Sequence, residues 1–128
     1  DLIDVFALKG LACDSRHVKD GYLFAAFPGA AQDGRAYIDE ALAKGARAIL
    51  ALPGTQLSGS SSAQLIVHEN PRRYFAMLAA AYYKDQPAQI AAVTGTNGKT
   101  SVVTFLAHIW RALGYEAASI GTLGVRSG

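Results

Sequence analysis

The residues best suited to chemistry lie in a glycine-rich loop at residues 93–101, with the sequence VTGTNGKTS. Glycines let backbone N–H groups curl around phosphate oxygens, and the positive end of a following helix attracts the same anion. In such loops the lysine, here Lys99, reaches the terminal phosphates, and the next hydroxyl, Thr100, binds Mg²⁺. The standard spacing G-x-x-x-x-G-K-[ST] requires glycine where this chain has Val93, so Gly95 begins a shorter G-x-x-G-K-T. The loop predicts nucleotide binding, against the alternative of a glycine turn that only begins a helix.

A second cluster of polar side chains lies upstream at Asp14, Ser15 and Arg16. A carboxylate, a hydroxyl and a guanidinium at the end of a strand can hold a diphosphate or a sugar. The loop at residues 28–34 follows the next strand, at the edge where open α/β sheets bind ligands. From these residues alone, two interpretations are equally supported. One is a binding site, and the other is a turn held by Asp14 with Arg16 in a surface ion pair.

These motifs need strands and helices to position them, and the hydrophobic pattern predicts both. Because strands and helices alternate, we expect a mainly parallel sheet. The Ser- and Gly-rich residues 55–64 predict a surface loop. Strands are predicted at 22–27, 46–52, 65–67, 90–93 and from 117 onward, and helices at 37–44, from Asn70-Pro71 onward, and at 99–113.

A polar segment at residues 84–87 ends in proline and predicts a domain boundary. The expected fold class is therefore α/β in two parts. We expect residues 1–87 to form a small Rossmann-like α/β domain. We expect residues 88–128 to form the start of a P-loop-type, parallel-sheet ATP-binding domain.

The composition excludes several classes of protein. Of the 128 residues, 51% are hydrophobic and 17% are charged, which favours a packed core over disorder. The net charge is only +2 and the basic residues are scattered, which argues against a nucleic-acid partner. No apolar run approaches the roughly 20 residues that span a bilayer, and the acidic start lacks a secretory signal. We expect a cytoplasmic protein without membrane insertion, and a lone Cys13 that is buried as a small hydrophobe.

Longer patterns around both motifs resemble the Mur ligase family. Residues 14–26 read D-S-R-x-V-x-x-G-x-L-F-x-A, residues 29–34 read G-x-x-x-D-G, and residues 41–48 read A-x-x-x-G-A-x-A. The loop at 93–101 matches the family's T-G-T-N-G-K-[TS], including the missing first glycine. The resemblance extends from Cys13 to Val125. Residues 109–124 are most similar to the members that add the third amino acid to the muramoyl peptide.

The resemblance implies an activity and assigns roles by position. It implies an ATP- and Mg²⁺-dependent ligase that adds an amino acid to UDP-N-acetylmuramoyl-L-alanyl-D-glutamate through an acyl phosphate. The residues that choose between diaminopimelate and lysine are not in this sequence, so both stay open, and diaminopimelate is the favoured one. It implies a catalytic role for Lys99 and a Mg²⁺ ligand in Thr100. The implied ATP-binding residues are Gly95, Thr96, Asn97, Gly98, Lys99, Thr100 and Ser101. The implied contacts with the UDP portion are Cys13, Asp14, Ser15, Arg16, Ala30, Ala31 and Gln32.

Some parts of such an enzyme are missing from this sequence. There is no acidic residue on a later strand that could complete the Mg²⁺ site, no modified-lysine region and no amino-acid-binding domain. We therefore expect an incomplete N-terminal part that is inactive without the missing C-terminal part. The alternatives are the D-alanyl-D-alanine-adding Mur ligase, which Asn97 disfavours, and a non-catalytic UDP-sugar-binding module. Folate polyglutamylation enzymes lack the D-S-R domain, and a P-loop GTPase or kinase needs the glycine that Val93 replaces.

Overall fold

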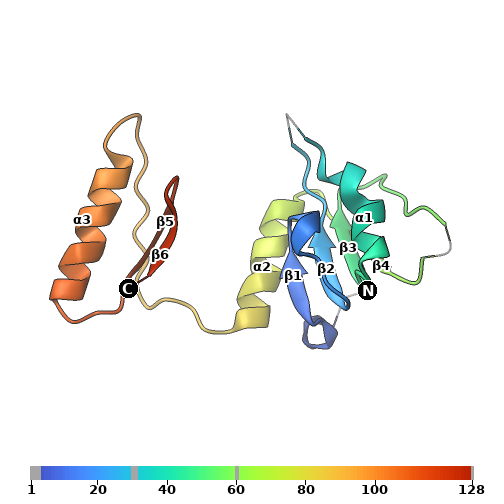
Figure 1. Cartoon of the computed structure of the whole chain (residues 1–128), viewed down its shortest axis with the longest axis horizontal. Helices are drawn as coiled ribbons and strands as arrows, with labels where there is room; N and C mark the ends of the chain where they lie inside the picture. Colours follow the sequence, from blue (N-terminus) through green and yellow to red (C-terminus); the bar gives the residue numbers. More distant parts are fainter. Residues whose placement is uncertain (1–3, 30–31, 60, 128) are drawn as a thin grey trace. The chain divides into compact units, whose positions relative to one another are not determined.

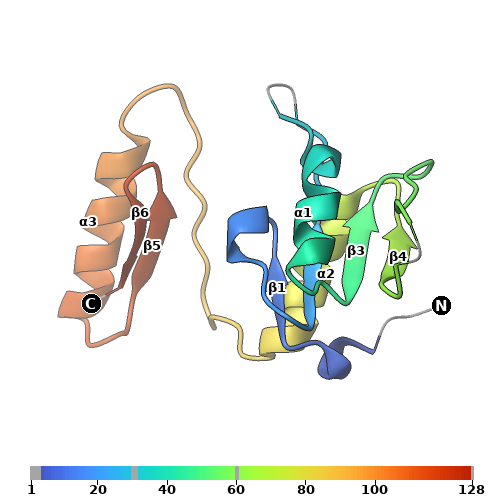
Figure 2. The same ribbon diagram turned by 45° about the vertical axis from the view of Figure 1, so that its right-hand side comes forward.

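A computed structural model describes residues 4–29, 32–59 and 61–127. The chain divides into two compact units, Asp1–Gln86 (unit 1) and Pro87–Gly128 (unit 2). Figures 1 and 2 show both units from two directions. In the described part of the chain, no helix is both long enough and apolar enough to cross a membrane.

Unit 1 is built on a four-stranded sheet in which every neighbouring pair is parallel, in the order β1-β2-β3-β4. The predicted strands at 22–27 and 46–52 are confirmed within shorter bounds, and the one at 65–67 begins one residue earlier, at Gln64. The strands are β1 (Gly10–Ala12), β2 (Tyr22–Ala25), β3 (Ala48–Ala51) and β4 (Gln64–Val67). The helices are α1 (Ile38–Ala43) and α2 (Pro71–Tyr83), with short 3-10 turns η1 (Val5–Ala7), η2 (Ser15–His17) and η3 (Gly34–Tyr37).

The two faces of this sheet are buried by different helices, because successive side chains of a strand point to opposite faces. Phe24 and Ile49 pack in one cluster with residues of α1. Leu23 and Leu50 pack in a second cluster with Leu78 of α2. The result is three layers, helix, sheet and helix, with the inner strands β2 and β3 buried on both sides, as expected of a parallel sheet (Figure 2).

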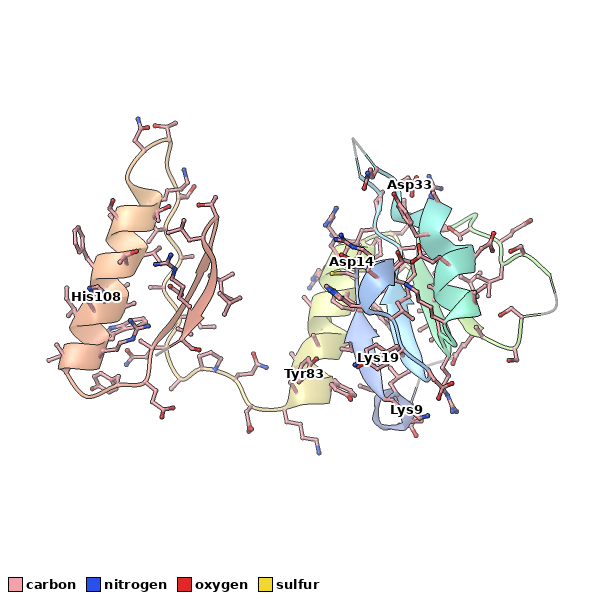
Figure 3. All side chains as sticks on the ribbon, viewed as in Figure 1. Lys9, Asp14, Lys19, Asp33, Tyr83 and His108 are labelled. Atoms are coloured by element: carbon pink, nitrogen blue, oxygen red, sulfur yellow. The ribbon has the colours of Figure 1, made fainter. Side chains whose placement is uncertain are left out.

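The segments that follow β1 and β2 meet at the carboxyl edge of the sheet. Asp14 caps η2 by accepting a hydrogen bond from the backbone N–H of Arg16, and Asp33 caps η3 through Arg35 in the same way. Figure 3 shows Asp14 and Asp33 toward one end of unit 1 and Lys9, which precedes β1, at the other. Parallel topology therefore gathers both predicted loops at one edge.

Unit 2 contains α3 (Lys99–Ala112) and an antiparallel hairpin of β5 (Ala118–Gly121) and β6 (Gly124–Ser127). The predicted helix at 99–113 is confirmed, and the strand expected from 117 onward forms as β5. The strand predicted at residues 90–93 is wrong, since this segment is irregular and pairs with no strand among the described residues. A strand needs a neighbour to satisfy its backbone groups, and β5 finds one in β6 across a turn at residues 122–123.

Many large apolar side chains of unit 2 are exposed. Leu113, which directly follows α3, is 67% exposed, whereas Ala107 within α3 is 5% exposed. Unit 1 has fewer such residues, because its sheet has a helix on each face to cover it.

Candidate functional site

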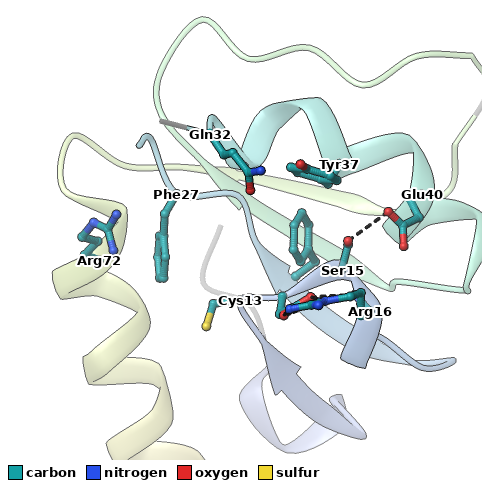
Figure 4. A pocket seen from close by; sticks show the side chains of 11 residues that line it. Cys13, Ser15, Arg16, Phe27, Gln32, Tyr37, Glu40 and Arg72 are labelled. Carbon is teal, nitrogen blue, oxygen red and sulfur yellow. Dashed lines mark hydrogen bonds and ion pairs between the residues drawn. The ribbon is translucent and has the colours of Figure 1, made fainter. Parts of the chain in front are cut away.

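A pocket of about 580 Å³ opens at the carboxyl edge of the unit 1 sheet (Figure 4). It brings together five residues predicted to contact UDP, namely Cys13, Asp14, Ser15, Arg16 and Gln32. The other two, Ala30 and Ala31, lie outside the described residues. The remaining lining residues, which the sequence did not single out, are Phe24, Phe27, Gly34, Tyr37, Glu40 and Arg72.

Ser15 is the buried polar residue of this pocket, with only 6% of its surface exposed. Its Oγ donates a hydrogen bond to Glu40 Oε2 at 3.0 Å. Lys44 Nζ donates to Glu40 Oε1 at 2.7 Å and to the carbonyl oxygen of Ser15 at 2.9 Å. The Lys44 hydrogen bond, and then the one from Ser15, hold the pKa of Glu40 below its ordinary value. Because the hydroxyl hydrogen points at a carboxylate, Ser15 Oγ presents its lone pairs to a ligand.

Asp14 and Arg16 form a closed pair beside Ser15. The Asp14 carboxylate accepts from the Arg16 backbone N–H at 2.9 Å, from Nε at 3.0 Å and from Nη2 at 2.6 Å. The side-chain and backbone hydrogen bonds from Arg16 hold the pKa of Asp14 well below its usual range. The interpretation of this segment as a turn with an ion pair is therefore confirmed, and the same turn forms one wall of the pocket.

The far wall of the pocket comes from the end of β2 and the start of α2. The Phe27 ring packs edge-on against Phe75, with ring centroids 5.5 Å apart, and the Arg72 guanidinium lies 4.7 Å from the Phe27 centroid. Arg72 Nη2 also donates to the carbonyl oxygen of Pro28 at 3.0 Å. The prediction that Cys13 is buried is wrong, because Cys13 is exposed at the pocket, just beyond the end of β1.

The phosphate-type loop of unit 2 has the backbone its glycines predict. Gly95 has φ +145° and Gly98 has φ +77°, conformations that disfavour residues with a Cβ. Gly98 is the N-cap of α3 and supplies no side-chain cap, and the first turn of the helix contains no acidic residue. The first N–H groups of α3 therefore suit an anion. Lys99 Nζ donates to the carbonyl oxygen of Gly95 across this loop.

A smaller pocket of about 190 Å³ lies between the start of α3 and the β5-β6 hairpin. Lys99 and Thr100 line it together with Val93. The other predicted ATP residues, Thr96, Asn97 and Ser101, are exposed on the loop or the first turn of α3. Thr100 offers a hydroxyl that suits Mg²⁺, but no carboxylate lines this pocket, and the described residues contain no acidic or His/Cys cluster able to hold a metal.

Comparisons with known proteins point to one family over residues 7–128. The family described as "Mur ligase family, catalytic domain" matches residues 7–101, and that described as "Mur ligase middle domain" matches residues 93–128. A UDP-N-acetylmuramoyl-L-alanyl-D-glutamate--2,6-diaminopimelate ligase of Caulobacter vibrioides is 51% identical over 92% of this chain and 24% of its own length. The protein of the same name from Zymomonas mobilis subsp. mobilis is 49% identical over 94% of this chain and 24% of its own length. The chain thus spans about a quarter of the length of these curated relatives.

Solved structures give the same result for the fold. The solved structure of a UDP-N-acetylmuramoyl-L-alanyl-D-glutamate--2,6-diaminopimelate ligase matches with a TM-score of 0.71 and 29% identity. The match covers 94% of this chain and 25% of that chain. The structure of MurF ligase from Thermotoga maritima in complex with ADP matches with a TM-score of 0.64 and 27% identity. The match covers 87% of this chain and 25% of that chain. The predicted α/β fold class is confirmed. Because a family match covers residues 7–101, well over half of the sequence, this chain belongs to the Mur ligase family.

Proposed function

We propose that unit 1 binds the uridine diphosphate end of UDP-N-acetylmuramoyl-L-alanyl-D-glutamate. The observation that carries this proposal is the pocket at the carboxyl edge of the sheet. There, buried Ser15 lies beside Asp14, Arg16 and Gln32, which the family pattern assigns to this ligand. A 580 Å³ pocket with aromatic walls and a few fixed polar groups suits a nucleotide. The names of the relatives that are about half identical support the same substrate.

Unit 2 then supplies the beginning of an ATP site in a ligase of peptidoglycan precursor synthesis. In that reaction a substrate carboxylate oxygen attacks the γ-phosphorus of ATP and ADP leaves. The amine of diaminopimelate next attacks the acyl carbon and phosphate leaves. Lys99 and the N–H groups at the start of α3 would neutralise charge on the phosphoryl group in transfer. The Thr100 hydroxyl would be one Mg²⁺ ligand beside the phosphates, with the carboxylate ligands supplied from outside the described residues.

The D-alanyl-D-alanine-adding ligase is the second candidate, because solved structures of that enzyme also match this chain. The match has a TM-score of 0.58, against 0.71 for the diaminopimelate ligase. Both candidates place a UDP-muramoyl peptide on unit 1, so they differ in the length of the peptide and not in the nucleotide pocket.

Calorimetric titration of the full chain tests the proposal. We expect UDP-N-acetylmuramoyl-L-alanyl-D-glutamate and UDP to bind and to compete with each other. We expect ATP to leave both affinities unchanged, since it would bind the loop at residues 93–101. A folded sample, shown by its circular dichroism, that binds neither UDP ligand contradicts the proposal for unit 1.

Ser15→Ala is expected to weaken UDP binding about two- to tenfold, the loss of one hydrogen bond. Glu40→Gln is expected to weaken it to a similar extent, because the hydroxyl of Ser15 is then no longer held by a carboxylate. In the double variant the two losses should not add, since Glu40 acts through Ser15. The measurement is a double-mutant cycle of UDP dissociation constants.

The matched control for this cycle is Asp39→Asn. Asp39 is the neighbouring acidic residue of α1, is exposed, and contacts Ser58 outside the pocket. The UDP affinity of the Asp39→Asn variant should equal that of the unchanged chain. If the losses of UDP affinity from Ser15→Ala and Glu40→Gln add in full in the double variant, Glu40 does not act through Ser15.

A further inference from the structure

The charges that line the unit 1 pocket do not all cancel. Its charged lining residues are Asp14, Arg16, Glu40 and Arg72. Asp14 and Arg16 neutralise each other, and Glu40 is neutralised by Lys44, which lies outside the lining. No carboxylate pairs with Arg72 in the described part of the chain. Arg72 is therefore the source of unbalanced positive charge in the pocket.

Arg72 is also held in place without using up its donors. Its guanidinium stacks 4.7 Å from the Phe27 ring centroid and, among the described residues, gives one hydrogen bond, from Nη2 to the Pro28 carbonyl oxygen. A guanidinium has five N–H donors in a fixed plane, so most of them stay free for an anion. The ring below it fixes that plane and so reduces the entropy lost on binding.

The two ends of the pocket differ in chemistry. Figure 4 shows Arg72 and Phe27 at one end, and Ser15 and Glu40 at the other. The Ser15 end offers a hydroxyl oxygen that can accept a hydrogen bond from a ligand. The negative charge of Glu40 at this end is balanced by Lys44. That end suits the neutral, N–H- and O–H-bearing part of a nucleotide, whereas the Arg72 end suits phosphate.

We propose that Arg72 binds the diphosphate of the UDP ligand and so sets its direction in the pocket, with the uridine toward Ser15. The proposal rests on the proposed function, that UDP binds this pocket, and adds the residue that recognises the phosphates. Arg16 does not have this role, because its guanidinium already donates to both carboxylate oxygens of Asp14, from Nε to Oδ1 and from Nη2 to Oδ2.

The test compares UDP with uridine on the full chain, because uridine lacks the phosphates. Chemical-shift titration suits it, since it follows weak binding. Arg72→Gln should weaken UDP binding about 10- to 100-fold, the effect of one charged hydrogen-bonding group. It should change uridine affinity less than about twofold, the control that the pocket stays folded. Raising the salt concentration should weaken UDP binding to the unchanged chain more than to this variant.

Two control variants separate Arg72 from its surroundings. Arg73→Gln removes the neighbouring positive charge, which does not line the pocket, and should leave UDP affinity unchanged. Asp14→Asn combined with Arg16→Gln removes the ion pair without changing the net charge, and should weaken UDP less than Arg72→Gln does.

The outcomes distinguish this inference from the proposed function. If the unchanged chain binds UDP but Arg72→Gln weakens UDP and uridine equally, or weakens neither, the inference is wrong and the proposed function stands. The inference is also wrong, and the proposed function stands, if the Asp14→Asn/Arg16→Gln variant, and not Arg72→Gln, loses affinity for UDP but keeps its affinity for uridine. If the unchanged, folded chain binds no UDP, the proposed function fails and the inference fails with it.

Discussion

Ile49→Ala is expected to lower the free energy of unfolding of unit 1 by about 2–5 kcal/mol. Ile49 lies in β3, an inner strand of the sheet, and none of its surface is exposed. It packs in the cluster that joins the sheet to α1, together with Phe24 and Ile38. Truncation leaves a cavity that these neighbours fill only in part. A unit of this size has a total free energy of unfolding of roughly 5–10 kcal/mol, so the expected loss is a large fraction of it.

Chemical denaturation monitored by circular dichroism measures this loss. Met77→Ala in α2 is the matched control, because Met77 is 60% exposed and should change stability by less than about 0.5 kcal/mol. We also expect Ile49→Ala to weaken UDP binding under partly denaturing conditions, because Phe24 lines the pocket. Equal stabilities of the two variants would show that the α1 side of the sheet is not the packed core described here.

Gly34→Ala is expected to disturb the pocket itself. A Cβ at this position would lie 2.7 Å from the backbone nitrogen of Phe27 and 2.8 Å from its carbonyl oxygen. The Gly34 N–H also donates to that oxygen at 2.8 Å, so the two segments touch directly. Backbone atoms cannot move aside as a flexible side chain can. We expect a loss of about 1–3 kcal/mol in stability and a loss of UDP affinity at least as large as that of Ser15→Ala.

Gly54→Ala provides the comparison for this variant. Gly54 has φ +83° and open space around it, so alanine there costs about 1 kcal/mol of conformational energy and touches nothing. Gly54 does not line the pocket, and UDP affinity should stay the same. A Gly34→Ala chain that binds UDP as well as Gly54→Ala does would show that the loop joining Phe27 to Gly34 does not shape the site.

The sequence was sufficient for the parts of the molecule that depend on neighbours along the chain. Continuous apolar runs predicted β2 and β3, and Asn70-Pro71 predicted the start of α2, where Asn70 Oδ1 accepts a hydrogen bond from the Arg73 N–H. The loop at 93–101 was predicted for the same reason, since glycine conformations and a helix start are local properties. The segment at residues 13–16 was found as a cluster because its polar groups are adjacent in sequence.

Other properties depended on which segments meet in space. The hydrogen bond from Ser15 to Glu40 joins residues 25 positions apart, and that from Arg72 to Pro28 joins residues 44 apart. Neither Glu40 nor Arg72 belongs to a recognisable local motif. Parallel strand order brings α1 and the start of α2 to the same edge, and so brings both residues to the pocket.

The errors of the sequence interpretation have the same origin. An apolar segment such as residues 90–93 becomes a strand only if another strand pairs with it, and Cys13 is buried only if something covers the end of β1. The sequence by itself determined the local elements, the glycine loop and the polar cluster at 13–16, because these follow from short-range sterics and hydrogen bonds. Only the tertiary structure decided which charges remain unpaired in the pocket and how its two ends differ, because charge balance depends on residues that are distant in the chain.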